Sequence, residues 1–182
     1  MRDAVIVSTA RTPIGRAYKG AFNTTTGATL GHYSAKAAVE RAGIDPGTID
    51  DVVWGSALQQ GSQGGNLARQ VALRAGFPIE VPGMTIDRQC SSGLMAIATA
   101  SKQVTLDMMD VVVGGGQDSI STVQTPEMRV QPDRELLKMH ADIYMPMLQT
   151  AEVVADRYGI SREACDEYAL QSQMRTAAAQ DA

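Results

Sequence analysis

Short apolar runs and helically spaced apolar residues alternate along the first 118 residues of the chain. Runs rich in Val and Ile, or brief extended runs, predict strands at residues 4–8, 52–54, 84–87 and 110–113. Between them, apolar residues three or four positions apart predict helices at residues 30–42, 66–75 and 91–104. This βαβαβαβ order predicts an α/β fold, in which parallel strands are joined by right-handed crossovers and helices cover the sheet.

Two local signals support the first of these helices. Lys36 and Glu40 are four residues apart, so their side chains are expected to pair across one helical turn. Gly43 follows the last apolar position and is expected to end the helix in a left-handed conformation.

The pattern changes after residue 118, and we expect a core domain at 1–118 followed by a helical subdomain at 119–182. Residues 125–144 are polar and predict a loop, whereas the apolar spacing predicts helices at 149–158 and 161–179. Ser161 is a good N-cap for the second of these helices. Its apolar stripe includes Cys165, so we interpret that cysteine as a core residue.

Charge and composition exclude several classes of function. The formal net charge is −4 and basic residues are scattered, so nucleic acid is not an expected partner. The longest apolar runs are far shorter than the ~20 residues that span a bilayer, and the N-terminal residues do not resemble a signal peptide. The two cysteines suggest a reducing, cytoplasmic setting, and the two distant histidines give no metal-binding spacing.

Cys90 is the candidate nucleophile, because it lies between a predicted strand and a predicted helix. Unpaired N–H groups at a helix start favour an anion, and therefore a thiolate, although a base must assist. The alternative is a buried, inert cysteine, since free cysteine is among the most buried residue types. His32 and His140 are the available imidazoles, and we interpret both as solvated or structural, which disfavours a cysteine hydrolase.

Two glycine-rich segments do not match known phosphate-binding loops. Residues 114–116 lack the third glycine of a dinucleotide fingerprint, because Ser119 occupies that position, and they predict a tight turn beside the active site. Residues 61–66 lack the Lys-Ser/Thr ending of a phosphate loop and predict a flexible interface loop.

Several segments together resemble the thiolase family, in the right order over nearly the whole chain. They are Arg11–Gly15, Asn66–Gln70, Asp87–Gly93, Gly114–Ser121, Thr150–Glu152, Tyr158–Glu163 and Asp166–Ala169. The resemblance implies the amino-terminal half of a layered thiolase fold that forms or cleaves 3-ketoacyl-coenzyme A. It implies that Cys90 carries the acyl group as a thioester, that its backbone N–H helps bind the oxyanion, and that Met147 lines the acyl pocket.

The same resemblance implies coenzyme A thioesters as substrates, no cofactor, and a homodimer or homotetramer with residues 61–69 at an interface. The chain departs from the family pattern at Asp87, Gly65 and Pro146, where Asn, Gln and His are more usual. The family's second half supplies an activating histidine and a second cysteine, whose motifs do not occur here. We therefore expect little activity from this chain alone, and completion by a further segment or polypeptide. The alternative is a non-catalytic module that binds acyl-coenzyme A or dimerises.

Overall fold

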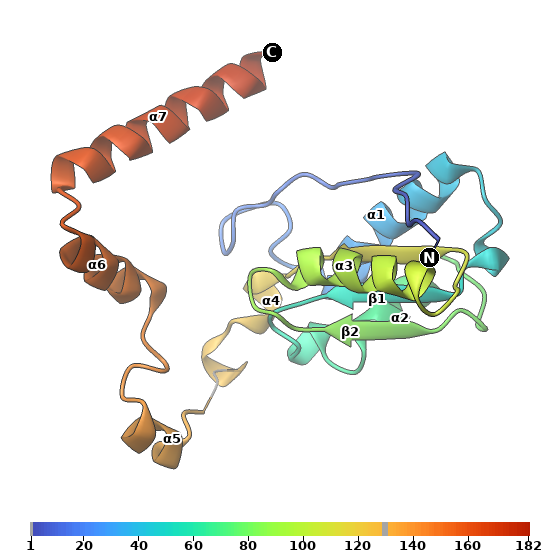
Figure 1. Cartoon of the computed structure of the whole chain (residues 1–182), viewed down its shortest axis with the longest axis horizontal. Coiled ribbons are helices and arrows are strands. Elements are labelled where there is room, and N and C mark those ends of the chain that lie inside the picture. The colour runs from blue at the N-terminus through green and yellow to red at the C-terminus, as the bar shows by residue number, and fades with distance from the viewer. Residues whose placement is uncertain (1, 129–130) are drawn as a thin grey trace. The chain divides into compact units, whose positions relative to one another are not determined.

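A computed structural model describes residues 2–128 and 131–182 of the chain. The chain divides into two compact units, Met1–Arg129 and Val130–Ala182, which are described separately here (Figure 1). The domain boundary that the sequence predicts between residues 118 and 119 stays a prediction. Residues 129 and 130, which belong to the loop predicted at 125–144, lie outside the described residues.

The first unit contains a parallel three-stranded sheet in the order β2-β1-β3. Its strands are β1 (Asp51–Gly55), β2 (Gly83–Ile86) and β3 (Val112–Gly116). The central strand β1 is buried at every position, as expected for a parallel strand that is covered on both faces. The predicted parallel α/β arrangement is confirmed.

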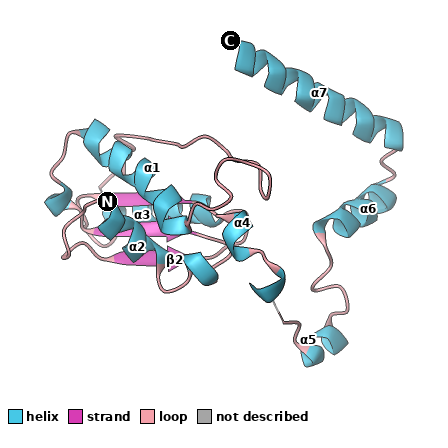
Figure 2. Ribbon diagram, turned by 180° about the vertical axis from the view of Figure 1, so that it is seen from behind, coloured by secondary structure: helices cyan, strands magenta, loops and turns pink. Residues whose placement is uncertain are grey.

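Helices cover both faces of this sheet. On one face α1 (Gly27–Ala42) and α2 (Leu67–Arg74) pack on β1, and Figure 2 views this side of the sheet. On the other face α3 (Ser92–Thr105) packs on β1 and β3, as Figure 1 shows. Side chains of β1 alternate between the two cores, because Val52 and Trp54 join the α1 and α2 cluster whereas Val53 joins the α3 cluster.

The local signals in α1 are confirmed. Lys36 Nζ lies 3.7 Å from Glu40 Oε1, and Gly43 ends the helix with a φ of 67°. By contrast, the strand predicted at residues 4–8 is wrong, because residues 2–16 form neither helix nor strand. Val5, Ile6 and Val7 are 75%, 74% and 77% exposed. Strand propensity forms a strand only where a neighbouring strand accepts its hydrogen bonds, and none lies beside this segment among the described residues.

The glycine triplet at residues 114–116 is also not the predicted turn. These residues are the last three of β3 and pair with Val53, Trp54 and Gly55 of β1. The residues after the strand, from Gln117 onward, lead into the short helix α4 (Ile120–Val123).

The second unit is helical, with α5 (Arg134–Met139), α6 (Met147–Tyr158) and α7 (Arg162–Asp181). The 3-10 turn Pro126–Met128 and α5 occupy part of the predicted loop, and Asp133 caps α5 by accepting a bond from Leu136 N at 2.8 Å. Ser161 caps α7 by accepting a bond from Ala164 N at 3.2 Å, as predicted. Cys165 is exposed, so its assignment to a core is wrong. An apolar stripe shows which face of a helix would pack, but a partner surface must still be present.

Candidate functional site

Cys90 lies in a tight turn that joins the end of β2 to the start of α3, and it is exposed. The carboxyl ends of the three parallel strands meet at this edge of the sheet. Ligands of open α/β sheets bind beyond the carboxyl ends of the strands, so the position of Cys90 is typical of a reactive group. Cys90 is therefore not buried, as the alternative interpretation required, and its role as nucleophile stays a prediction.

The residue before the thiol has an unusual backbone conformation. Gln89 has a φ of 49°, which places a non-glycine residue in the left-handed region. Its N–H donates to Asp87 Oδ1 at 2.6 Å. Ser92 Oγ lies inside the turn, where it accepts from Arg88 N at 2.9 Å and donates to Gln89 O at 2.6 Å. These hydrogen bonds hold a conformation that costs of order 1–3 kcal/mol by itself.

The strand ends contact the start of α3 directly. Ser56 N donates to Ile86 O at 3.0 Å, and Gln117 N donates to Gly55 O at 3.1 Å, which ties the three strand ends together. Gly55 lies so close to α3 that a Cβ atom on it would be 2.3 Å from the carbonyl carbon of Ser92. The turn that carries Cys90 is therefore followed directly by a close backbone contact between the end of β1 and the first residues of α3.

A buried polar network lies beside these strand ends. The carboxylate of Asp118 accepts hydrogen bonds from Ser56 Oγ at 2.9 Å, from the N–H groups of residues 57 and 58 at 3.2 Å each, and from Gln63 Nε2 at 2.9 Å. Gln63 is fully buried, and its Oε1 accepts from Ser119 N at 2.6 Å. The loop at 61–66, predicted to be flexible, is thus anchored by a buried side chain.

Neither Asp118 nor Gln63 was predicted from the sequence to belong to the site. A signal was available for one of them, because Ser56 and Asp118 are polar residues that closely follow buried strands. Such residues meet at the same edge of a parallel sheet. Gln63 gave no comparable signal, since a glutamine in a glycine-rich loop is usually solvated.

The two histidines lie in different units, and His32 is engaged within its own helix. His32 Nδ1 lies 2.6 Å from Thr29 O within α1, and the imidazole packs on Tyr33 with ring centroids 4.0 Å apart. His140 is exposed and follows α5 in the second unit. Among the described residues of the first unit, no hydrogen bond links the His32 imidazole to Cys90.

Met147 begins α6 in the second unit and is 73% exposed. Within residues 2–128 and 131–182, no three side chains of the metal-binding types come together as a cation site. In the same ranges, no helix combines the length and the apolar character needed to cross a bilayer.

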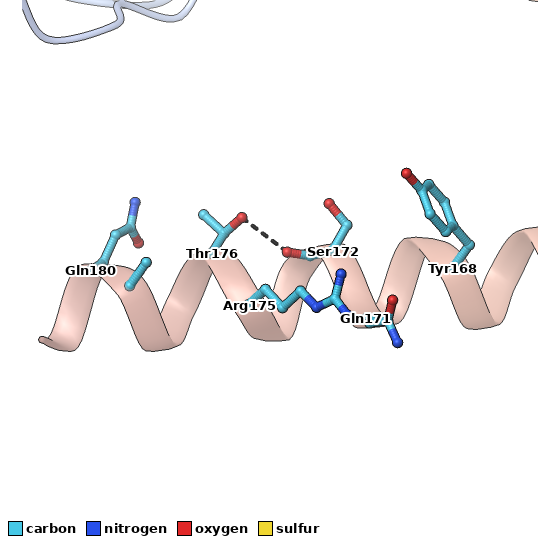
Figure 3. Close-up of a pocket in the computed structure, with 7 residues that line it drawn as sticks. Tyr168, Gln171, Ser172, Arg175, Thr176 and Gln180 are labelled. Atoms are coloured by element: carbon cyan, nitrogen blue, oxygen red, sulfur yellow. Dashed lines mark hydrogen bonds between the residues drawn. The ribbon is translucent and has the colours of Figure 1, made fainter.

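Two hollows on the surface are lined by residues other than Cys90. Figure 3 shows the first, about 400 Å³, where side chains from Tyr168 to Gln180 line one side of α7. The dashed line marks the Thr176 Oγ1 bond to Ser172 O at 2.9 Å, an interaction within the helix. The second hollow, about 550 Å³, lies between residues 10–25 and α1. The first hollow runs along the single helix α7 and brings no converging reactive groups together, so the Cys90 turn is the better candidate site.

Comparison with known proteins gives a consistent result. Residues 4–182 match the family model described as the thiolase N-terminal domain. The chain is 41% identical over 179 residues to a 3-ketoacyl-CoA thiolase of Bacillus subtilis (strain 168), covering 98% of this chain and 46% of that protein. It is 41% identical over 194 residues to an acetyl-CoA acetyltransferase of Cupriavidus necator, covering 100% of this chain and 49% of that protein.

A solved structure gives the same result for the fold. The crystal structure of the Bacillus anthracis acetyl-CoA acetyltransferase matches 96% of this chain and 46% of its own chain, with a TM-score of 0.80 and 36% identity. The present chain thus spans about half the length of these relatives.

Proposed function

This chain belongs to the thiolase family, and we propose that it is the part of an acyltransferase that carries the acyl group, as a thioester on Cys90. The supporting observation is the exposed position of Cys90 on a hydrogen-bonded turn at the carboxyl edge of the parallel sheet. The substrates that we propose are acyl-coenzyme A and 3-ketoacyl-coenzyme A, as the names of the relatives suggest. We place this reaction in fatty acid metabolism.

The proposed reaction has two steps. The thiolate of Cys90 attacks the carbonyl carbon of an acyl-coenzyme A, a new S–C bond forms, and coenzyme A leaves as its thiolate. In the synthetic direction, the carbanion of a second acyl-coenzyme A then attacks the enzyme thioester and releases Cys90. The cleavage direction runs the same steps backwards. The backbone N–H of Cys90 itself suits the oxyanion that forms in each attack.

A base must assist both steps, and we propose that it comes from a segment equivalent to the second half of the relatives. The outer face of α3 supports this proposal, because Leu94 is 71% exposed and Ile97 is 42% exposed beside the Cys90 turn. General acid and base groups contribute about 10²–10⁴-fold to such reactions, so the chain alone should transfer acyl groups slowly. Met147 is the proposed acyl-pocket residue, and the proposed assembly is a homodimer or homotetramer in the cytoplasm.

Intact mass spectrometry after incubation with acetyl-coenzyme A tests this function. We expect a gain of one acetyl group that is lost in Cys90→Ala and kept in Cys165→Ala, which removes the other exposed thiol. Acetylation that follows Cys165 would contradict the assignment of the nucleophile. If Cys90 takes up iodoacetamide but no acetyl group, the chain is instead a binding or dimerisation module.

A further inference from the structure

We propose that Ser92 is a positioning residue for Cys90, acting through the turn that its hydroxyl group closes. Ser92 is two residues beyond the thiol, is 4% exposed and belongs to the first turn of α3. Its effect on thiol reactivity does not depend on the proposed function, but its relevance to acyl transfer rests on that function.

The contacts of the Ser92 hydroxyl explain how it acts. A hydroxyl group has one proton and two lone pairs, and here the proton is donated to Gln89 O at 2.6 Å while a lone pair accepts from Arg88 N at 2.9 Å. One buried atom thus binds the peptide groups on both sides of the turn. Gln89, between them, is the residue with a φ of 49°.

Asp87 holds the same residue from the solvent side. Its Oδ1 accepts from Gln89 N at 2.6 Å, whereas the next nearest contact, from Ser92 Oγ, is 3.5 Å. This hydrogen bond requires an oxygen acceptor at residue 87. We therefore expect Asp87→Asn to retain the bond and Asp87→Ala to lose it. The conformation of Gln89 is therefore held by two side chains, one buried and one exposed, while Ser91 Oγ donates to Arg88 O at 2.8 Å in the same turn.

The direction of the Cys90 side chain depends on the backbone angles of Gln89. If these bonds are lost, Gln89 relaxes toward a negative φ, which a non-glycine residue prefers. The thiol then moves away from the start of α3, where the helix dipole favours the anionic form that reacts. The expected loss is about three- to fivefold in the reactivity of Cys90, the size of a helix-terminus effect.

The experiment compares the labelling rates of the two thiols within one molecule. The full chain is treated with limiting iodoacetamide, and peptide mass spectrometry gives the ratio of the labelling rates of Cys90 and Cys165. Cys165 is exposed in the second unit and serves as the internal reference. We expect Ser92→Ala to lower the ratio about three- to fivefold, and Ser101→Ala, an exposed position on the same helix, to leave it unchanged.

The Asp87 variants separate positioning from general damage to the fold. We expect Asp87→Ala to lower the ratio and Asp87→Asn to keep it, because Asn retains the acceptor for Gln89 N–H. A ratio within twofold of wild type in Ser92→Ala, with Trp54 fluorescence unchanged, would overturn the proposal. If Ser92→Ala fails to fold, equal ratios for Asp87→Ala and Asp87→Asn overturn it instead. Acetyl-coenzyme A labelling is read separately, so a failure of acyl transfer leaves this result intact.

Discussion

The close approach of β1 to α3 predicts that Gly55→Ala displaces the turn that carries Cys90. A Cβ atom at residue 55 would lie 2.3 Å from Ser92 C, 2.4 Å from Ser92 O and 2.5 Å from Gly93 N. Carbon atoms without a bond between them approach to about 3.5 Å, so the first turn of α3 must move by about 1 Å. The contacting atoms belong to the backbone, which cannot rotate away as a side chain would.

Overpacking of this kind costs about 1–3 kcal/mol of the free energy of unfolding. Gly93→Ala is the matched control, because a Cβ atom at that residue would meet nothing within 4 Å. Replacing a helical glycine by alanine there should stabilise the chain by about 0.5–1 kcal/mol. The two variants add the same methyl group to neighbouring residues, but only the methyl group on residue 55 meets other atoms, so their difference isolates the effect of the strand end.

Urea unfolding followed by fluorescence measures this difference, because the single tryptophan, Trp54, lies in β1 and is 2% exposed. With a slope of about 2 kcal/mol per molar urea, Gly55→Ala should lower the midpoint by about 0.5–1.5 M relative to wild type. Its Cys90 to Cys165 labelling ratio should fall as well. A midpoint for Gly55→Ala equal to that of Gly93→Ala would refute the argument, because it would show that the strand end and the helix separate without cost.

Two further predictions concern the buried network and α7. Gln63→Ala leaves Ser119 N–H and one acceptor site on Asp118 without a partner. Urea unfolding should therefore show a free energy of unfolding lower by about 2–3 kcal/mol. Gln59→Ala, at an exposed position, should change it by less than about 0.5 kcal/mol. The pKa of Glu163 is lowered by hydrogen bonds from its own backbone N–H and from the Ser161 hydroxyl, so its contribution to α7 is complete above the ordinary carboxyl pKa and is lost as the pH falls through the lowered value. Circular dichroism at 222 nm should therefore fall only at acidic pH, and Glu163→Gln should lack that step.

The sequence by itself determined most of the local structure. Apolar spacing and caps such as Gly43 and Ser161 predicted where α1, α2, α3, α6 and α7 lie along the chain, and apolar runs predicted where the three paired strands lie. These signals depend on residues within one or two turns. The candidate nucleophile was also visible in the sequence, since Cys90 follows a strand and precedes a helix. A junction of this kind is a local property of the chain.

The tertiary structure decided what depends on partners far away in the chain. The apolar run at residues 4–8 has the composition of a strand but no neighbour to pair with, and the stripe that includes Cys165 has no surface to pack on within its unit. The triplet at 114–116 is extended because β1 pairs with it, although glycines alone suggest a turn. The Asp118 and Gln63 network joins residues 55 positions apart, a separation that no local pattern encodes. Propensity and periodicity are local, whereas burial and hydrogen-bond satisfaction are set by whichever segments the fold brings together.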